Sequence, residues 1–79
     1  MEMQPEKLLD IFRQNVKQRR LELGFSQVQL AEKLGVDQGF ISDIERGIRN
    51  PSVAKLASLA EVLDTTPSAL ISSATLAGA

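Results

Sequence analysis

The stretch SQVQLAEKLGVDQGFISDIERG, residues 26–47, decides the fold of this chain. Ser26 followed by Gln29 has the form of a capping box, so we expect a helix to begin here. Gly35 is expected to end that helix, because glycine adopts the left-handed conformation of a helix C-terminus without strain. Asp37 is suited to cap a second helix. Both helices are too short to be stable in isolation, so other parts of the chain must support them.

Small and aliphatic side chains in this stretch are spaced as two crossing helices require. Helices that cross at a steep angle need a small residue where they touch, and Ala31 meets that need. Gly35 supplies the positive φ of a tight turn. Ile41 and Ile44 are expected to anchor the second helix to the core, which leaves its opposite face free to enter a DNA major groove. The stretch therefore predicts a helix-turn-helix.

Helical periodicity continues on both sides of this motif, and no segment shows the alternation of a strand. Pro5 is suited to a first helical turn, and apolar residues recur from there until Gly24. Ser52 is expected to cap a fourth helix, and Thr66 to open a short fifth one. Besides Ala31, Ile41 and Ile44, the residues expected in or near the core are Leu8, Ile11, Phe12, Val16, Leu23, Phe25, Leu30, Leu34, Phe40, Val53, Leu56, Leu59, Ala60, Leu63, Leu70 and Ile71.

The sequence thus predicts an all-α fold, a compact bundle of five helices. We expect one helix-turn-helix domain at residues 6–71, preceded by an N-terminal extension at residues 1–5. Residues 72–79, SSATLAGA, carry small side chains and no charge, and are expected to form a flexible tail.

The composition argues against an enzyme. The 79 residues include no His and no Cys, which removes the commonest general base, the thiol nucleophile and the usual metal ligands. The chain also lacks a glycine-rich phosphate loop of either standard spacing. We therefore expect no catalytic residue, no metal site and no cofactor.

The charge balance argues against strong, non-specific binding to nucleic acid. The net charge is −1 and the isoelectric point is near 5.3, whereas DNA-binding domains are usually basic. Cations nevertheless cluster at Lys17, Arg19 and Arg20, and again at Arg46 and Arg49.

No run approaches the ~20 apolar residues of a membrane span. The expected location is the cytoplasm, in association with the nucleoid, with no membrane partner.

Residues 15–71, NVKQRRLELGFSQVQLAEKLGVDQGFISDIERGIRNPSVAKLASLAEVLDTTPSALI, resemble the phage repressor/Cro-type (Xre-like) helix-turn-helix family. The specific parts are SQ at 26–27, LAEKLGV at 30–36, the IS..E.G pattern at 41–47, and NPS at 50–52 ahead of LASLAEVL. The resemblance implies a lambda repressor-like domain that binds double-stranded DNA sequence-specifically.

The resemblance also implies roles for individual residues. Gln27 would grip a backbone phosphate, helped by the amides at the start of its helix. Gln38 is the leading base reader, because a glutamine can bond an adenine bidentately. The recognition helix would span about residues 37–46. Arg20 and Glu45 would form a structural ion pair that joins the first helix to this recognition helix. The residues implied at base edges are Asp37, Gln38, Gly39, Ser42 and Asp43, and those implied at phosphates are Ser26, Gln27, Arg19, Arg46, Arg49 and Asn50.

Two positions depart from the family pattern. Gly39 stands where many members carry a polar or basic reader, so one contact is missing or is made by backbone. Asp43 places a carboxylate on the groove-facing side, where it repels phosphates but can accept a hydrogen bond from a cytosine amine. A plainer interpretation, in which these polar side chains are ordinary surface residues, remains open for Gln27, Gln38, Ser42, Arg46 and Arg49.

The sequence leaves three functions open. The first is a transcriptional regulator, a repressor in its simplest form, that binds a palindromic operator as a homodimer. Its dimer surface is expected around the fifth helix, at Leu63, Thr65, Pro67, Leu70 and Ile71. The second is an antitoxin-like component that binds a toxin partner and its own promoter. The third is a protein-interaction module that has lost DNA affinity, which the acidic isoelectric point favours.

Overall fold

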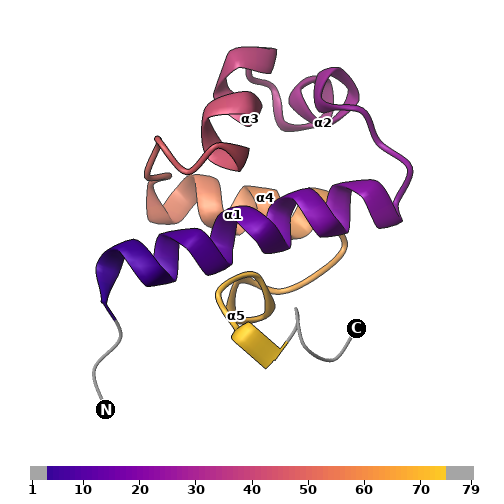
Figure 1. Cartoon of the computed structure of the whole chain (residues 1–79). Coiled ribbons are helices and arrows are strands. Elements are labelled where there is room, and N and C mark those ends of the chain that lie inside the picture. The colour runs from indigo at the N-terminus through magenta and orange to yellow at the C-terminus, as the bar shows by residue number, and fades with distance from the viewer. Residues whose placement is uncertain (1–3, 75–79) are drawn as a thin grey trace.

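The computed structural model describes residues 4–74, which form five helices and no strand (Figure 1). The helices are α1 (Pro5–Glu22), α2 (Gln27–Leu34), α3 (Gln38–Glu45), α4 (Val53–Val62) and α5 (Pro67–Leu70). The all-α, five-helix fold predicted from the sequence is confirmed. The expected N-terminal extension lies mostly outside the described residues, and so does most of the expected tail.

Side-chain caps define where four of the five helices begin. At α2 the capping box is complete: the Gln29 backbone N–H donates to Ser26 Oγ at 3.0 Å, and the Ser26 N–H donates to Gln29 Oε1 at 2.8 Å. Asp37 accepts from the Phe40 N–H at 2.9 Å and so caps α3. Ser52 and Thr66 cap α4 and α5 in the same way. These local bonds hold short helices at fixed starting points.

The helix-turn-helix unit rests on the other helices. Figure 1 shows α2 and α3 on one side of α1, with α5 on the opposite side. α2 packs against α3 and α4, whereas α1 packs against α3 and α5, and α4 also contacts α5. Each helix of the motif therefore has its own support, α1 for α3 and α4 for α2. This arrangement accounts for the stability of two helices that would not form alone.

The core is built from the aliphatic residues that the sequence placed there. The buried apolar residues are Ile11, Phe12, Val16, Leu30, Ala31, Ile41, Ile44, Leu59, Ala60, Leu63 and Leu70. The prediction was wrong for Val53 and Ile71, which are 83% and 38% exposed. Val53 is the first residue of α4 and Ile71 follows the last residue of α5, so both lie at helix ends. Phe25 and Phe40 are half-buried at the edge of the core.

Two turns of the motif require glycine. Gly35 ends α2 with φ of +79°, and its N–H donates to the Ala31 carbonyl at 2.8 Å. Gly47 follows α3 with φ of +77°. A Cβ at Gly47 would also lie 2.8 Å from Cδ of Arg13 on α1. Because these atoms belong to a flexible side chain that can move, the positive φ is what favours glycine at this position.

Two polar side chains of α1 hold the C-terminal part of the chain, which the sequence did not reveal. Asn15 is buried, and its Nδ2 donates to the carbonyls of Leu70 and Ser72 at 2.8 and 3.1 Å. Arg19 Nε donates to the Leu63 carbonyl at 2.7 Å, and Nη2 donates to the Asp64 carbonyl at 3.1 Å. The Asn15 bonds fix the four-residue helix α5 against α1, since a single helical turn has little stability of its own. The Arg19 bonds fix the turn that follows α4.

Replacement of Ala31 tests the packing of the motif. Ala31 is 3% exposed on α2, so Ala31→Leu should overpack the core and lower the free energy of unfolding by ~1–3 kcal/mol. Urea unfolding followed by circular dichroism measures this loss. Ala57→Leu, on an exposed part of α4, is the matched control and should change stability by less than ~0.5 kcal/mol. An unchanged stability of Ala31→Leu would contradict close packing at this position.

Candidate nucleic-acid interface

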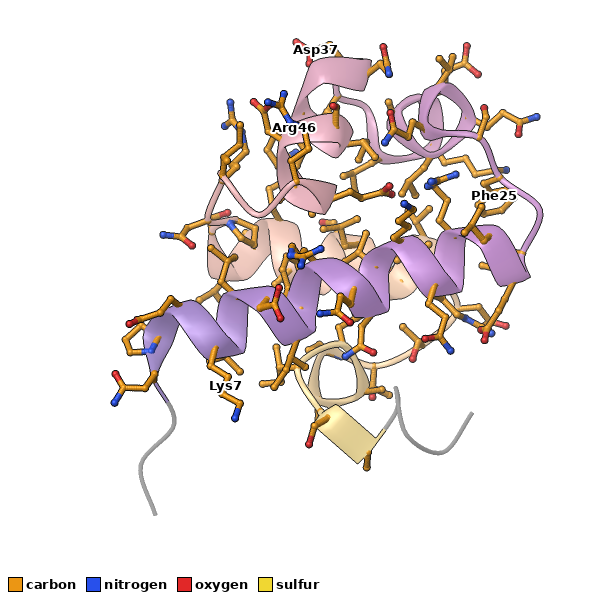
Figure 2. All side chains as sticks on the ribbon, in the orientation of Figure 1. Lys7, Phe25, Asp37 and Arg46 are labelled. Carbon is orange, nitrogen blue, oxygen red and sulfur yellow. The ribbon has the colours of Figure 1, made fainter. Side chains whose placement is uncertain are left out.

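The start of α3 is an exposed end of the molecule. Figure 2 shows Asp37 at the outer end of α3, far from α1. Gln38 and Gly39 are also exposed, whereas Ser42 and Asp43 are half-buried. The five residues expected at base edges therefore lie along one helix that begins at the surface and ends against α1.

A buried ion pair fixes the inner end of α3. Arg20 Nε lies 2.6 Å from Glu45 Oε2, and Arg20 Nη2 lies 3.0 Å from Glu45 Oε1. The two side chains are only 9% and 4% exposed. Arg20 Nη1 also donates to the Phe25 carbonyl at 2.8 Å. The bidentate pair joins α1 to α3, the two helices that the family resemblance implied it would join, and its burial makes it a strong constraint on the position of α3.

Two glutamines extend this pair to the surface. Gln27 Nε2 donates to Glu45 Oε1 at 3.1 Å, and Gln38 Nε2 donates to Gln27 Oε1 at 2.9 Å. We call this run of side chains the polar chain: Arg20, Glu45, Gln27 and Gln38. It begins in the core at α1 and ends at the exposed start of α3. The bridging position of Gln27 was not predicted, because the bonds join residues distant in sequence.

The polar chain leaves hydrogen-bonding atoms of both glutamines unused. A side-chain amide nitrogen carries two hydrogens, and each glutamine uses one of them within the chain. Gln38 keeps one N–H and its Oε1, the pair that bonds an adenine bidentately. Gln27 keeps one N–H beside the first backbone amides of α2, which have no partner inside the helix. Amides at a helix start suit a phosphate.

The residues expected at phosphates occupy different environments. Ser26 and Asn50 are exposed, and so is Arg46, which ends α3 and forms no ion pair among residues 4–74. Arg19 differs, because its guanidinium bonds the carbonyls of Leu63 and Asp64. The Arg19 guanidinium is thus used within the protein, which does not favour the phosphate contact that the resemblance implied.

Arg49 lies over α3 instead of extending into solvent. Its Cζ is 4.9 Å from the centre of the Phe40 ring, and its Nε is 3.8 Å from Asp43 Oδ2. The Arg49 side chain is 48% exposed and that of Asp43 is 34% exposed. The carboxylate that looked unfavourable for DNA binding thus has a cation beside it. Nothing in the sequence pattern indicated this contact.

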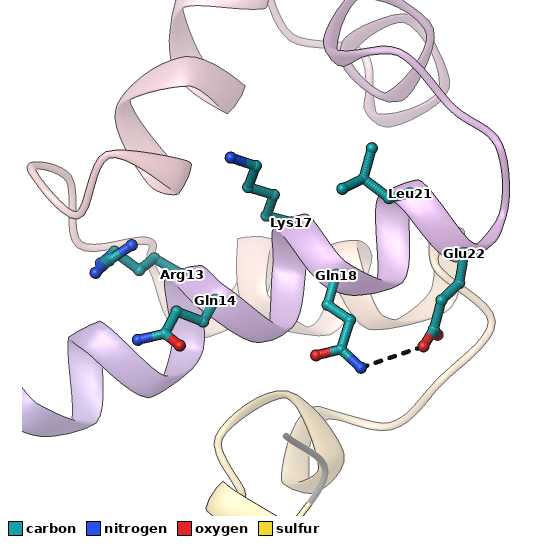
Figure 3. A pocket seen from close by; sticks show the side chains of 6 residues that line it. All are labelled: Arg13, Gln14, Lys17, Gln18, Leu21 and Glu22. Carbon is teal, nitrogen blue, oxygen red and sulfur yellow. Dashed lines mark hydrogen bonds between the residues drawn. The ribbon is translucent and has the colours of Figure 1, made fainter. Parts of the chain in front are cut away.

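A shallow hollow along α1 is not a second candidate site. Figure 3 shows the six side chains that line it, all from this one helix: Arg13, Gln14, Lys17, Gln18, Leu21 and Glu22. Gln18 donates to Glu22 at 3.2 Å across one turn. A groove lined by one helix face does not enclose a ligand.

None of the described helices is long and apolar enough to cross a membrane.

The fold and the exposed recognition helix define the class of protein. The helix-turn-helix family model matches residues 16–70, and the chain belongs to this family. The resemblance identified from the sequence is confirmed. The matched residues begin within α1 and end with α5, so the match includes the supporting helices as well as the motif.

Among its relatives are transcription regulators. The chain is 42% identical over 59 residues to the HTH-type transcriptional regulator SinR of Bacillus subtilis, covering 73% of this chain and 53% of SinR. It is 40% identical over 63 residues to the immunity repressor protein of Bacillus phage phi105, covering 80% of this chain and 44% of the repressor. The chain thus spans about half the length of these two relatives. The relatives are regulators and not enzymes.

Solved structures show the same fold. The controller protein C.AhdI from Aeromonas hydrophila has a TM-score of 0.74 and 37% identity, covering 78% of this chain and 94% of that one. SinR in complex with DNA has a TM-score of 0.73 and 40% identity, covering 77% of this chain and 98% of that one.

Neutralising Glu45 tests the buried pair. Glu45→Gln leaves the Arg20 guanidinium buried without a charged partner, which should lower the free energy of unfolding by ~3–5 kcal/mol. Asp10→Asn is the control, because Asp10 pairs with Arg13 on the surface, where its side chain is 47% exposed. Its loss should cost ~0–1 kcal/mol. Equal losses in the two variants, measured by urea unfolding, would contradict a special role for the buried pair.

Proposed function

We propose that the chain binds double-stranded DNA sequence-specifically through α3 and regulates transcription, acting as a repressor at a palindromic operator. The polar chain is the observation that carries this proposal. It connects a buried charge pair to Gln38 and so positions one amide at the exposed start of α3. A side chain held in this way loses little conformational freedom when it meets a base edge.

The proposed contacts divide between bases and phosphates. Gln38 reads an adenine, and Gly39 brings bare backbone to the groove. Asp37 uses Oδ1 as the cap of α3, so its other oxygen can accept from a cytosine amine. Ser42 adds a hydroxyl. The residues proposed to contact phosphates are Ser26, Gln27, Arg46 and Asn50.

The net charge of −1 implies that non-specific attraction to DNA is weak. Specificity then depends on a few fixed contacts, and binding should be found at the operator more than along the genome. The proposed location is the cytoplasm, where such a regulator meets the nucleoid.

Selection of bound duplexes from a random double-stranded library tests this function. The protein should recover an inverted repeat with half-sites about one turn, roughly 34 Å, apart. Recovery of no motif from protein shown to be folded would reject the function. It would favour a protein-interaction module, and a search for a bound partner would then address the antitoxin-like alternative.

Gln38→Ala should reduce base discrimination at one or two positions of each half-site, because it removes the bidentate amide. The expected loss is ~1–3 kcal/mol at the preferred site, with little change on unrelated DNA. Competition binding with single-base variants of the selected site measures it. Gln14→Ala, which removes an exposed amide of α1, is the matched control. A uniform loss on all sequences would make Gln38 a phosphate contact.

The surface proposed for a homodimer differs in part from the one the sequence suggested. Leu63 and Leu70 are 0% and 2% exposed in the core, so the expectation that they form the dimer surface was wrong. Exposed apolar residues lie instead in the loop after α3, at the start of α4 and after α5: Ile48, Val53 and Ile71. Ile71 also lines a groove together with Pro5, Leu8, Leu9, Phe12, Asn50, Pro51 and Leu56. We propose that the three exposed apolar residues, Ile48, Val53 and Ile71, face a second copy.

Val53→Glu tests the dimer without disturbing the fold, since the side chain is 83% exposed and an acid at the start of α4 suits the helix dipole. The dimer dissociation constant should rise by about tenfold or more, as loss of a central apolar contact causes. Sedimentation equilibrium measures it. Leu21→Glu, which is 58% exposed on α1, is the control and should leave the dimer intact. A Val53→Glu dimer as strong as the wild type would place the interface elsewhere.

A further inference from the structure

We infer that Arg49 is a specificity-determining residue that reads a guanine in the major groove, with Phe40 and Asp43 as its positioning residues. This inference rests on the proposed function, because it requires α3 to lie in the groove. It replaces the phosphate contact that the sequence suggested for Arg49.

Two contacts hold the guanidinium above the groove-facing helix. Phe40 and Asp43 are three residues apart on α3 and therefore lie on the same face of the helix. The Phe40 ring lies 4.9 Å from Arg49 Cζ, and the Asp43 carboxylate oxygen lies 3.8 Å from Arg49 Nε. Arg49 comes from the loop beyond α3, yet its charged end lies over the helix. Both contacts favour an orientation of the guanidinium over α3.

The contacts leave the reading edge of Arg49 free. The ion pair engages Nε, and neither terminal nitrogen, Nη1 nor Nη2, has a hydrogen-bond partner among residues 4–74. These two nitrogens form the fork that bonds O6 and N7 of guanine. Because the side chain is 48% exposed, the fork can reach a ligand without unfolding any element.

The same geometry explains the acid on α3. A lone carboxylate near DNA repels phosphates, so Asp43 would weaken binding to every sequence. Beside Arg49 its charge is compensated, and the carboxylate orients the guanidinium. Arg46 provides the contrast within the same segment, because it forms no ion pair or ring contact among the described residues and is suited to a phosphate.

The experiment compares Arg49→Lys with Arg46→Lys. Both variants keep the positive charge, but lysine lacks the planar fork. The wild type and both variants are passed through the random-duplex selection, after circular dichroism has shown that they melt alike. Arg49→Lys should lose its preference for guanine at one position of each half-site by about tenfold, whereas Arg46→Lys should keep the wild-type motif. Affinity for unrelated DNA should stay within about twofold for Arg49→Lys, because the charge is retained.

Asp43→Asn tests the positioning role. It should lower the guanine preference at the same position that Arg49→Lys affects, since it weakens one of the two contacts that hold the fork. A change only at a different base pair would overturn this role and make Asp43 a reader itself. If Arg49→Lys selects the same motif as the wild type, the inference about Arg49 is overturned and the proposed function stands. Failure of the wild type to select any motif overturns both.

Discussion

The buried ion pair between Arg20 and Glu45 is the contact on which the recognition surface depends. Removing two charges from water is costly, and such pairs often add little net stability. Here the cost is offset by a bidentate geometry and by two further bonds, one from Arg20 to the Phe25 carbonyl and one from Gln27 to Glu45. What the pair contributes is a defined position of α3 relative to α1, because a shift of either helix would leave a charge buried alone.

The other helices make that position rigid. α1 spans 18 residues and carries most of the long-range polar bonds, to α3 through Arg20 and to the C-terminal turns through Asn15 and Arg19. The apolar core fills the space between the helices with residues from all five of them. The motif is therefore an exposed part of a single packed unit, and a substitution in α1 can shift the position of α3 and, with it, the DNA contacts proposed for α3.

Local chemistry made the helices predictable, and distance in sequence limited the rest. Three helix starts could be predicted from Ser26, Asp37 and Ser52, because a capping side chain bonds a backbone N–H only three residues away. The Arg20–Glu45 pair was expected only through family resemblance. Val53 was misplaced because helical periodicity does not say where a helix first meets the core. Leu63 was correctly expected in the core, and its burial excludes only the second role suggested for it, at a dimer surface. The position of Arg49 over Phe40 depends on the path of the loop after α3, and the sequence pattern does not predict that path.

The polar chain also has a direction. A carboxylate paired with arginine only accepts hydrogen bonds, so the amide that meets Glu45 must present its nitrogen. The Gln27 side-chain oxygen therefore faces away from Glu45 and accepts a hydrogen bond from Gln38 Nε2. The Gln38 side-chain oxygen is left free as an acceptor at the surface. The donor and acceptor pattern at the molecular surface is thus set by a charge in the core. A neutral residue in place of Glu45 would let both amides rotate end for end, and the surface would then present two patterns where the native protein presents one.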